Sequence, residues 1–420
     1  MRFFVSARRV FFCLLFAVVL ALSGCAGAST IIGSTTPGAG ASTATTSGSG
    51  GTSPTATTPP TAPPHAFAWF QLDSAKVPQI WASLNGATPR QITHVAKDTS
   101  PCDDQVAWSP PVFSPDLKHI VASLGSYQCG DGPLNGPLSI ITVSSGALAT
   151  VPGINGANFI RITQRAAGWI DASTIWYINY SGLFTYKLGA VSTTLVSTLG
   201  GVRPEEAALR GSTLFYSYQN PGPGSTPANQ YLGRFAMTSA SVMPGAINMG
   251  TIAGCACSPG DYRTPGWDVS ADGSHVVYQI VTPGSGTDEG VSSSKFYYAN
   301  ADGSGAARIA SNVATNRLAR LSITPNGALV AITAALPSPS VITASVNSSG
   351  ASGDPNLHAY HPDAYDFPVW KWDSSTFWAA SEAASDTGSG TSNLYAFTVS
   401  GSSSTVGVSG GYNPWYTIGS

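Results

Sequence analysis

The sequence predicts an all-β protein and, within that class, a seven-bladed β-propeller, with six or eight blades as alternatives. Beyond residue 65 the apolar runs are short, β-branched and aromatic, and they are bounded by Gly, Pro, Asn, Asp and Ser, as strands are. A unit of strand, tight polar turn and strand recurs about every 52 residues, against about 40–50 for familiar blade repeats. The 46 glycines and 30 prolines are typical of a chain with many turns.

The first 24 residues carry an export signal. Three arginines precede an apolar run over 10–22, which is shorter than the roughly 20 residues that span a bilayer. Leu22-Ser23-Gly24-Cys25 resembles the lipobox of bacterial lipoproteins. This resemblance implies removal of residues 1–24, diacylglycerol on the Cys25 sulfur and acylation, as with palmitate, of the new N-terminus. An ordinary signal peptide with a chance Cys is the alternative.

Residues 25–65 are predicted to be the lipidated Cys25 followed by a disordered tether. The segment consists mainly of Ser, Thr, Gly, Ala and Pro, and no residue between Arg9 and Asp73 is charged. Such a composition buries too little surface to offset the entropy of ordering. We expect a flexible chain, stiffened by polyproline II near its end, that holds the folded part away from the lipid surface.

The repeat unit begins with a hairpin. Full copies occupy residues 112–122, 267–278 and 321–332, and shorter copies occupy residues 171–177, 210–216 and 373–379. Pro115 and Pro325 preset the turn in two of the full copies, Asp or Asn bonds its own backbone, and Gly273 and Gly327 supply positive φ. A second hairpin-like pair occurs at 80–93, 295–309 and 394–406. Two hairpins make four strands, which is one propeller blade.

Two of these segments carry a family resemblance. Phe113-Ser-Pro-Asp116 and residues 302–310 resemble the blades of TolB-like and other WD40-like propellers. Leu117 stands where those blades have a turn glycine, and three units have the shortened turn. The resemblance implies a propeller over residues 66–420.

The two ends of this region are predicted to share a blade. Residues 67–71, 79–84 and 91–94 give three strands, and residues 414–418 give a fourth. A blade built from both termini closes the ring and removes exposed sheet edges. With six full blades this gives seven; a two-domain all-β chain is the alternative.

Charge narrows the classes of partner. Only 10% of residues are charged, against about 25% in ordinary domains, and the net charge is −2. Removal of residues 1–24 would remove three arginines, so the net charge of the mature chain would be about −5. A negative net charge disfavours nucleic acid and anionic lipid head groups as direct partners. The acyl chains on Cys25 are then the expected membrane contact. We expect a monomer without a cofactor.

Few residues suggest chemistry. Residues 407–411 fit Gly-x-Ser-x-Gly, but a nucleophile elbow needs a strand before it and a helix after it, so we interpret the match as chance. A metal site is not expected; the candidate ligands that cluster in one loop are His358, His361, Asp363 and Asp366. Glu205 and Glu206 are interpreted as solvated loop acids. Core packing between blades is the expected role of Trp108, Trp169, Trp267, Trp370 and Trp372.

The functional interpretation is a lipid-anchored protein on the extracytoplasmic side of the cell membrane that binds or scaffolds an envelope protein or peptide on a propeller face. A propeller enzyme, a hydrolase or lyase acting on glycans, is one alternative, and a spacer without a ligand is another. The enzyme hypothesis requires acids and a histidine to converge near the axis. The candidates for that convergence are Asp103, Asp104, Glu205, Glu206, His361 and Asp363.

Four cysteines remain beyond Cys13 in the signal and Cys25, namely Cys102, Cys129, Cys255 and Cys257, and an even number in an exported protein favours disulfides. We predict Cys102–Cys129, because the loops before the first strand and after the second strand of a blade emerge on one face. Cys255 and Cys257 would close a small strained ring, with a redox or metal role as the alternative. Mass spectrometry of the exported protein should find the Cys102–Cys129 link, and four free thiols would contradict it.

Overall fold

The computed structural model describes part of the chain, all of it within one compact unit, Thr61–Ser420. The described residues are 66–419 except 76, 97–105, 110, 127–134, 154–159, 162–164, 221–226, 254–263, 285–290, 311–312, 314, 316–317, 336–338, 347–355, 358–364, 371–373, 382–390, 400–402 and 411–415. The signal segment, the tether and all six cysteines lie outside them.

The described strands fall into seven antiparallel sets, named blades 1 to 7 here. Blade 1 has β31 (Tyr416–Gly419), β1 (Ala66–Leu72), β2 (Pro78–Leu84) and β3 (Arg90–Gln91); blade 2 has β4 (Val106–Trp108), β5 (Val112–Phe113), β6 (His119–Ser126), β8 (Leu138–Thr142) and β9 (Leu148–Thr150); blade 3 has β11 (Ala167–Trp169), β12 (Thr174–Asn179), β13 (Gly182–Lys187) and β14 (Thr194–Ser197). A separate pair is β7 (Asn135–Gly136) with β10 (Ile160–Arg161).

The remaining blades follow the same order. Blade 4 has β15 (Pro204–Arg210), β16 (Thr213–Asn220), β17 (Ala228–Ala236) and β18 (Ser241–Ile252); blade 5 has β19 (Trp267–Val269), β20 (His275–Pro283), β21 (Val291–Asn300) and β22 (Ala307–Ile309); blade 6 has β23 (Arg320–Ile323), β24 (Leu329–Ala335), β25 (Pro339–Ser345) and β26 (Asn356–Leu357); blade 7 has β27 (Tyr365–Trp370), β28 (Thr376–Ser381), β29 (Thr391–Thr398) and β30 (Ser403–Gly410).

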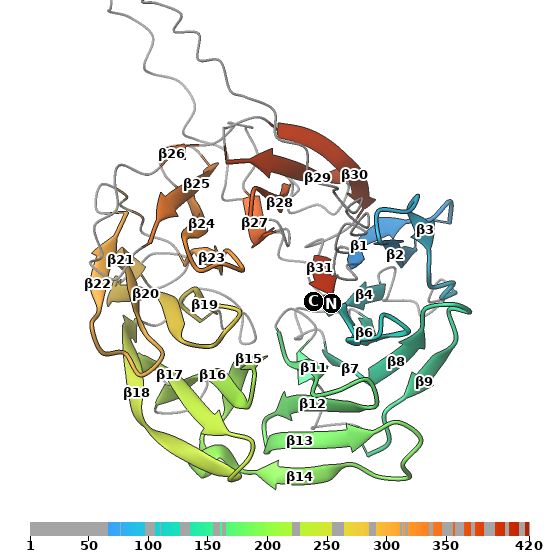
Figure 1. The fold of residues 1–420 in the computed structure, drawn as a ribbon, viewed down its shortest axis with the longest axis horizontal. Coiled ribbons are helices and arrows are strands. Elements are labelled where there is room, and N and C mark those ends of the chain that lie inside the picture. The colour runs from blue at the N-terminus through green and yellow to red at the C-terminus, as the bar shows by residue number, and fades with distance from the viewer. Residues whose placement is uncertain are drawn as a thin grey trace, which may run out of the picture. The chain divides into compact units, whose positions relative to one another are not determined.

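The sets are arranged around a centre, with first strands such as β11, β15, β19 and β23 nearest to it (Figure 1). This confirms the predicted all-β propeller class, while the count of seven blades stays a prediction. The helical segment among the described residues is a 3₁₀ turn, η2 (Leu199–Gly201). None of them forms a helix long and apolar enough to cross a bilayer.

Blade 1 is assembled from the two ends of the described region. Strand β1 pairs with β2 on one side and with the C-terminal strand β31 on the other. The register places Ala66 opposite Gly419 and Trp69 opposite Tyr416. The sequence predicted this pairing of three early strands with one late strand.

The predicted hairpin turns are built as the sequence suggests. In blade 5 the Ser270 hydroxyl donates to the Asp272 carboxylate (2.6 Å) and accepts from the His275 amide (3.0 Å), while the Ser274 amide donates to Asp272 (3.0 Å). Gly273 has a φ of 73°. Leu117 takes the same left-handed conformation in blade 2 with a φ of 59°, so that turn keeps its shape without glycine at a steric cost.

Tryptophans join neighbouring blades. The indole of Trp169 in blade 3 donates to the Val112 carbonyl of blade 2 (2.9 Å), and that of Trp370 in blade 7 donates to the Ser322 carbonyl of blade 6 (2.7 Å). Both side chains are buried, as is that of Trp267. These three therefore have the predicted core role; the side chains of Trp108 and Trp372 lie outside the description.

Blades 4 and 5 are additionally joined backbone to backbone. Gly250 of β18 pairs in parallel with Val281 of β20, which links the two sheets into one. Gly250 has a φ of 93°, and a Cβ atom there would overlap the Val281 carbonyl. Only glycine permits this approach.

The Asp272 turn generates a pH-dependent contribution to stability. Hydrogen bonds from Ser270 and Ser274 lower the pKa of Asp272 from 3.8 to about 2. The folded state therefore gains stability above the unfolded pKa, and this gain is lost as the pH falls from about 4 towards 2. Asp272→Asn should lower stability at pH 7 by no more than about 1 kcal/mol, because the turn is exposed to solvent.

The measurement is the melting temperature of both proteins between pH 7 and pH 2. Their difference should stay constant down to pH 5 and shrink below pH 4. A difference that is unchanged at pH 2.5 would contradict the assignment.

Candidate functional site

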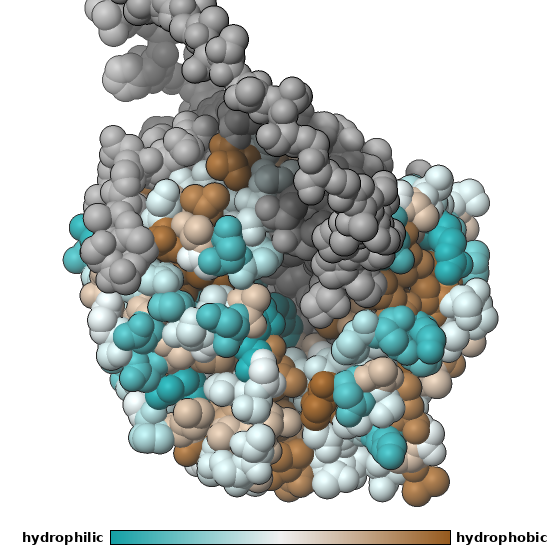
Figure 2. Space-filling view, in the orientation of Figure 1, coloured by the Kyte–Doolittle hydropathy of each residue, from teal (hydrophilic) through white to brown (hydrophobic). Residues whose placement is uncertain are grey.

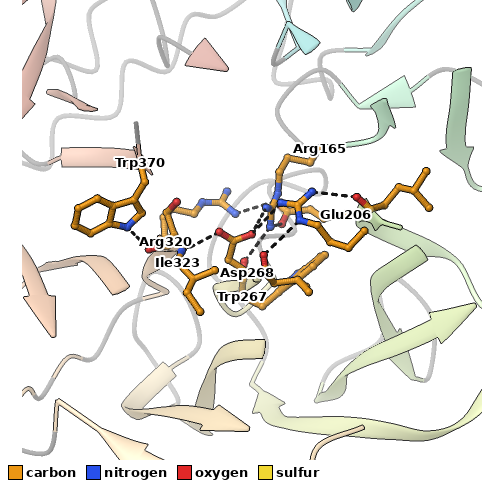
Figure 3. A network of polar contacts seen from close by, with 11 residues as sticks. Arg165, Glu206, Trp267, Asp268, Arg320, Ile323 and Trp370 are labelled. Atoms are coloured by element: carbon orange, nitrogen blue, oxygen red, sulfur yellow. Dashed lines mark hydrogen bonds and ion pairs between the residues drawn. The ribbon is translucent and has the colours of Figure 1, made fainter. Parts of the chain in front are cut away.

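A network of charged side chains lies at the centre of the described ring. Arg165 precedes β11, Glu206 lies on β15, Asp268 on β19 and Arg320 on β23, so blades 3, 4, 5 and 6 each contribute (Figure 3). Arg210, at the end of β15, also belongs to it. We call Arg165, Glu206, Arg210, Asp268 and Arg320 the central network.

Asp268 connects four blades. Its Oδ1 accepts a hydrogen bond from Arg165 Nη1 (3.1 Å) and lies 3.8 Å from Arg210 Nη2. Its Oδ2 accepts from the backbone amide of Ile323 (3.0 Å). One carboxylate of blade 5 thus holds side chains of blades 3 and 4 and the inner strand of blade 6.

Glu206 is the second anion of the central network. Its Oε1 accepts from Arg320 Nη1 (2.8 Å), and its Oε2 lies 3.8 Å from Arg165 Nη2. The backbone amide of Glu206 donates to Ser217 Oγ on the next strand (3.2 Å). A register shift in β15 falls at Glu205, between Pro204 and Glu206, and such bulges re-aim side chains next to functional sites.

The interpretation of Glu205 and Glu206 as solvated loop acids is wrong. Both lie in β15, and each is 3% exposed. The segment Pro-Glu-Glu-Ala-Ala is poor in strand-forming residues, so its local sequence suggests a loop. Burial of the Glu206 carboxylate is possible because Arg320 and Arg165 supply the opposite charge.

Arg165 also packs on an aromatic ring. Its guanidinium lies 4.6 Å from the centre of the Trp267 ring, and its Nη2 donates to the Trp267 carbonyl (2.9 Å). Within the described part of the chain, neither the buried Trp267 ring nitrogen nor the Thr264 hydroxyl has a hydrogen-bond partner. Two unsatisfied polar groups therefore lie within four residues of Asp268, and buried groups of this kind call for an explanation.

The exposed part of the central network is cationic. The side chains of Arg165 and Arg210 are 32% and 33% exposed, while those of Glu206 and Asp268 are 4% and 9% exposed. Loss of hydration lowers the pKa of Arg210, the Asp268 carboxylate opposes this shift, and repulsion from Arg165 adds to it. The arginine side chains of the central network are thus more accessible to solvent than its two carboxylates.

Most other candidates from the sequence lie outside the described residues. These are Cys25, Cys102, Asp103, Asp104, Cys129, Cys255, Cys257, His358, His361 and Asp363. Asp366 lies in β27, but its side chain is outside the description. Among the described residues no group of three or more His, Cys, Asp or Glu could hold a metal ion. Strand β30 runs through residues 407–410, so the Gly-x-Ser-x-Gly match is not a strand–turn–helix elbow.

Arg165, Arg210, Asp268 and Arg320 were not singled out in the sequence. Their contacts join residues that are 103 and 114 positions apart, so no local pattern reveals them. The available signal was the repeat itself, since aligned blades place these residues on or next to first strands.

No protein-family model and no curated protein matches this chain. Solved structures resemble its fold. The periplasmic gluconolactonase of Pseudomonas aeruginosa matches with 13% identity and a TM-score of 0.47, over 84% of this chain and 99% of that one. A post-proline cleaving enzyme from Rickettsia typhi matches with 10% identity and a TM-score of 0.45, over 81% and 51%. A chain of the mitotic checkpoint complex matches with 14% identity and a TM-score of 0.44, over 79% and 88%.

Removing the charge of Asp268 should destabilise the propeller. Asp268→Asn leaves Arg165 and Arg210 without their shared counter-ion, and breaking a mostly buried ion pair costs about 2–4 kcal/mol. Urea denaturation measures the loss. Asp171→Asn, in an exposed turn, is the matched control and should cost less than about 1 kcal/mol. If the free energy of unfolding of Asp268→Asn were within about 0.5 kcal/mol of that of the parent protein, the central network would contribute little to stability.

Proposed function

We propose that the chain is a lipid-anchored binding or scaffolding protein on the extracytoplasmic side of the cell membrane, with a protein or peptide partner. The observation that carries the anchor is Leu22-Ser23-Gly24-Cys25 at the end of an export signal. Two or three acyl chains on Cys25 would hold the protein stably, where one would not.

The tether would give the propeller reach. The composition of residues 26–65 predicts a flexible coil, whose average end-to-end distance would be about 35 Å by the relation for Gly- and Ser-rich chains. This separation lets the folded part meet a partner embedded in or bound to the envelope without contact between the propeller and lipid.

The central network reaches both ends of the inner strands. The tether leads into Ala66, which pairs with Gly419 at the end of the inner strand β31. Arg210 lies at this same end of the inner strand β15. Glu206 and Arg320 lie near the starts of β15 and β23, which is the opposite end.

The contacts of the central acids support binding over catalysis. A general acid or base must exchange a proton with its substrate. Glu206 and Asp268 instead each accept a hydrogen bond from an arginine, and both are less than 10% exposed, so a substrate has little access to either carboxylate. On the face in Figure 2, hydrophilic and hydrophobic residues are intermingled over the described atoms.

Lipidation at Cys25 is tested by metabolic labelling with an alkyne analogue of palmitate. The parent protein should carry the label and sediment with membranes. Cys25→Ser should lose both properties and appear in the soluble fraction. Cys13→Ser, in the apolar run of the signal, is the matched control and should keep the label. An unlabelled parent protein, or a labelled Cys25→Ser variant, would contradict the anchor.

The binding role is tested separately by cross-linking in intact cells. An affinity tag belongs in the tether, because the C-terminal strand β31 is part of blade 1. A specific partner should be captured by the parent protein and competed by the purified untagged chain. Capture that untagged protein does not reduce would count against a specific partner.

A further inference from the structure

The arginines of the central network have hydrogen-bonding capacity that the network does not use. Arg210 donates through Nη1 to the Leu209 carbonyl (3.0 Å) and through Nε to the Val269 carbonyl (3.4 Å). Its Nη2 is 3.8 Å from Asp268 and makes no hydrogen bond to a described residue. Arg165 uses Nη1 and Nη2, and its Nε has no partner within that same part of the chain.

These two guanidinium groups are held close together against their mutual repulsion. Asp268 contacts both and offsets part of this repulsion. About a third of each side chain is exposed, whereas Glu205, Glu206 and Asp268 are each less than 10% exposed. Two like charges held side by side on partly exposed side chains can bind an anion, which relieves their repulsion.

The neighbouring acids select the charge of that anion. Glu206 and Asp268 lie within 4 Å of the arginines and would repel a dianionic phosphate about twice as strongly as a monoanionic carboxylate. A carboxylate also matches the fork of N–H groups that a guanidinium presents. The unpartnered ring nitrogen of Trp267 and hydroxyl of Thr264 lie on the same segment as Asp268.

We propose that Arg165 and Arg210 form a binding site for a carboxylate group of a peptide, at the centre of the propeller. This inference rests on the proposed binding function and specifies its ligand. The carboxylate comes from the C-terminus of the peptide or from an acidic side chain. Arg320, which is bonded to Glu206, positions that acid beside the site.

The test uses purified full-length protein in detergent and three hexapeptides of Gly and Ser with an uncharged fluorescent dye at the N-terminus. The first has a free C-terminus, the second is amidated, and the third is amidated with one central Glu. Fluorescence anisotropy measures binding. The amidated peptide without Glu should bind at least tenfold more weakly than the better of the other two, and those two distinguish the sources of the carboxylate.

Variants assign the binding to the arginines. Arg210→Gln should weaken binding of the carboxylate peptide about tenfold or more, as expected for a charged hydrogen bond. Arg210→Lys keeps the positive charge but lacks the forked N–H groups of a guanidinium. Its affinity for the carboxylate peptide should lie between those of the parent protein and Arg210→Gln. Arg203→Gln removes an exposed charge at the start of the same blade, where it contacts Tyr180, and should bind like the parent protein. Arg210→Gln retains the bonds from Asp268 to Arg165 and Ile323, and thermal melting confirms its folding.

Three results would overturn the proposal. They are dissociation constants weaker than about 1 mM for all peptides, equal binding by Arg210→Gln, and inorganic phosphate competing better than acetate. In these cases the arginines serve as ion pairs between blades or as a phosphate site. Since labelling at Cys25 and capture of a partner do not depend on Arg210, the proposed function would survive that outcome.

Discussion

The pairing of β1 with β31 is the constraint on which the remaining blades depend. Each blade buries its faces against two neighbours, so the ring is stable only when its first and last blades meet. Backbone hydrogen bonds between Ala66–Leu72 and Tyr416–Gly419 supply that closure, and Phe67 stacks on Trp378 of blade 7 with ring centres 4.5 Å apart. Residues about 350 positions apart must therefore find each other, which is the kind of contact that slows folding.

Closure also fixes the geometry of the centre. Asp268 and Glu206 can reach residues of four blades only because the first strands converge there. The five charges of the central network are held there by the ion pairs and hydrogen bonds that join the four blades. The guanidinium groups are thus oriented before any ligand arrives, which reduces the entropy cost of binding.

The turns and strands could be predicted from local sequence, whereas the pairing of distant segments could be predicted only in part. Ser270, Asp272 and Gly273 form the turn that their order predicts, and the split blade followed from counting strands at both ends. Glu205 and Glu206 were misplaced because their strand lacks β-branched and aromatic residues. The partners of Asp268 escaped prediction since a charge pair across blades leaves no periodic signal.

The backbone bridge at Gly250 has a consequence for how the protein opens. Side-chain contacts between neighbouring blades separate when one sheet unfolds. Blades 4 and 5 are also joined by a backbone pairing, between Gly250 of β18 and Val281 of β20. Local opening of either sheet must break the other's edge, so the two behave as one cooperative unit of hydrogen exchange. Asp268 and Arg210 both lie within that unit, so opening of either sheet would disturb the centre of the molecule.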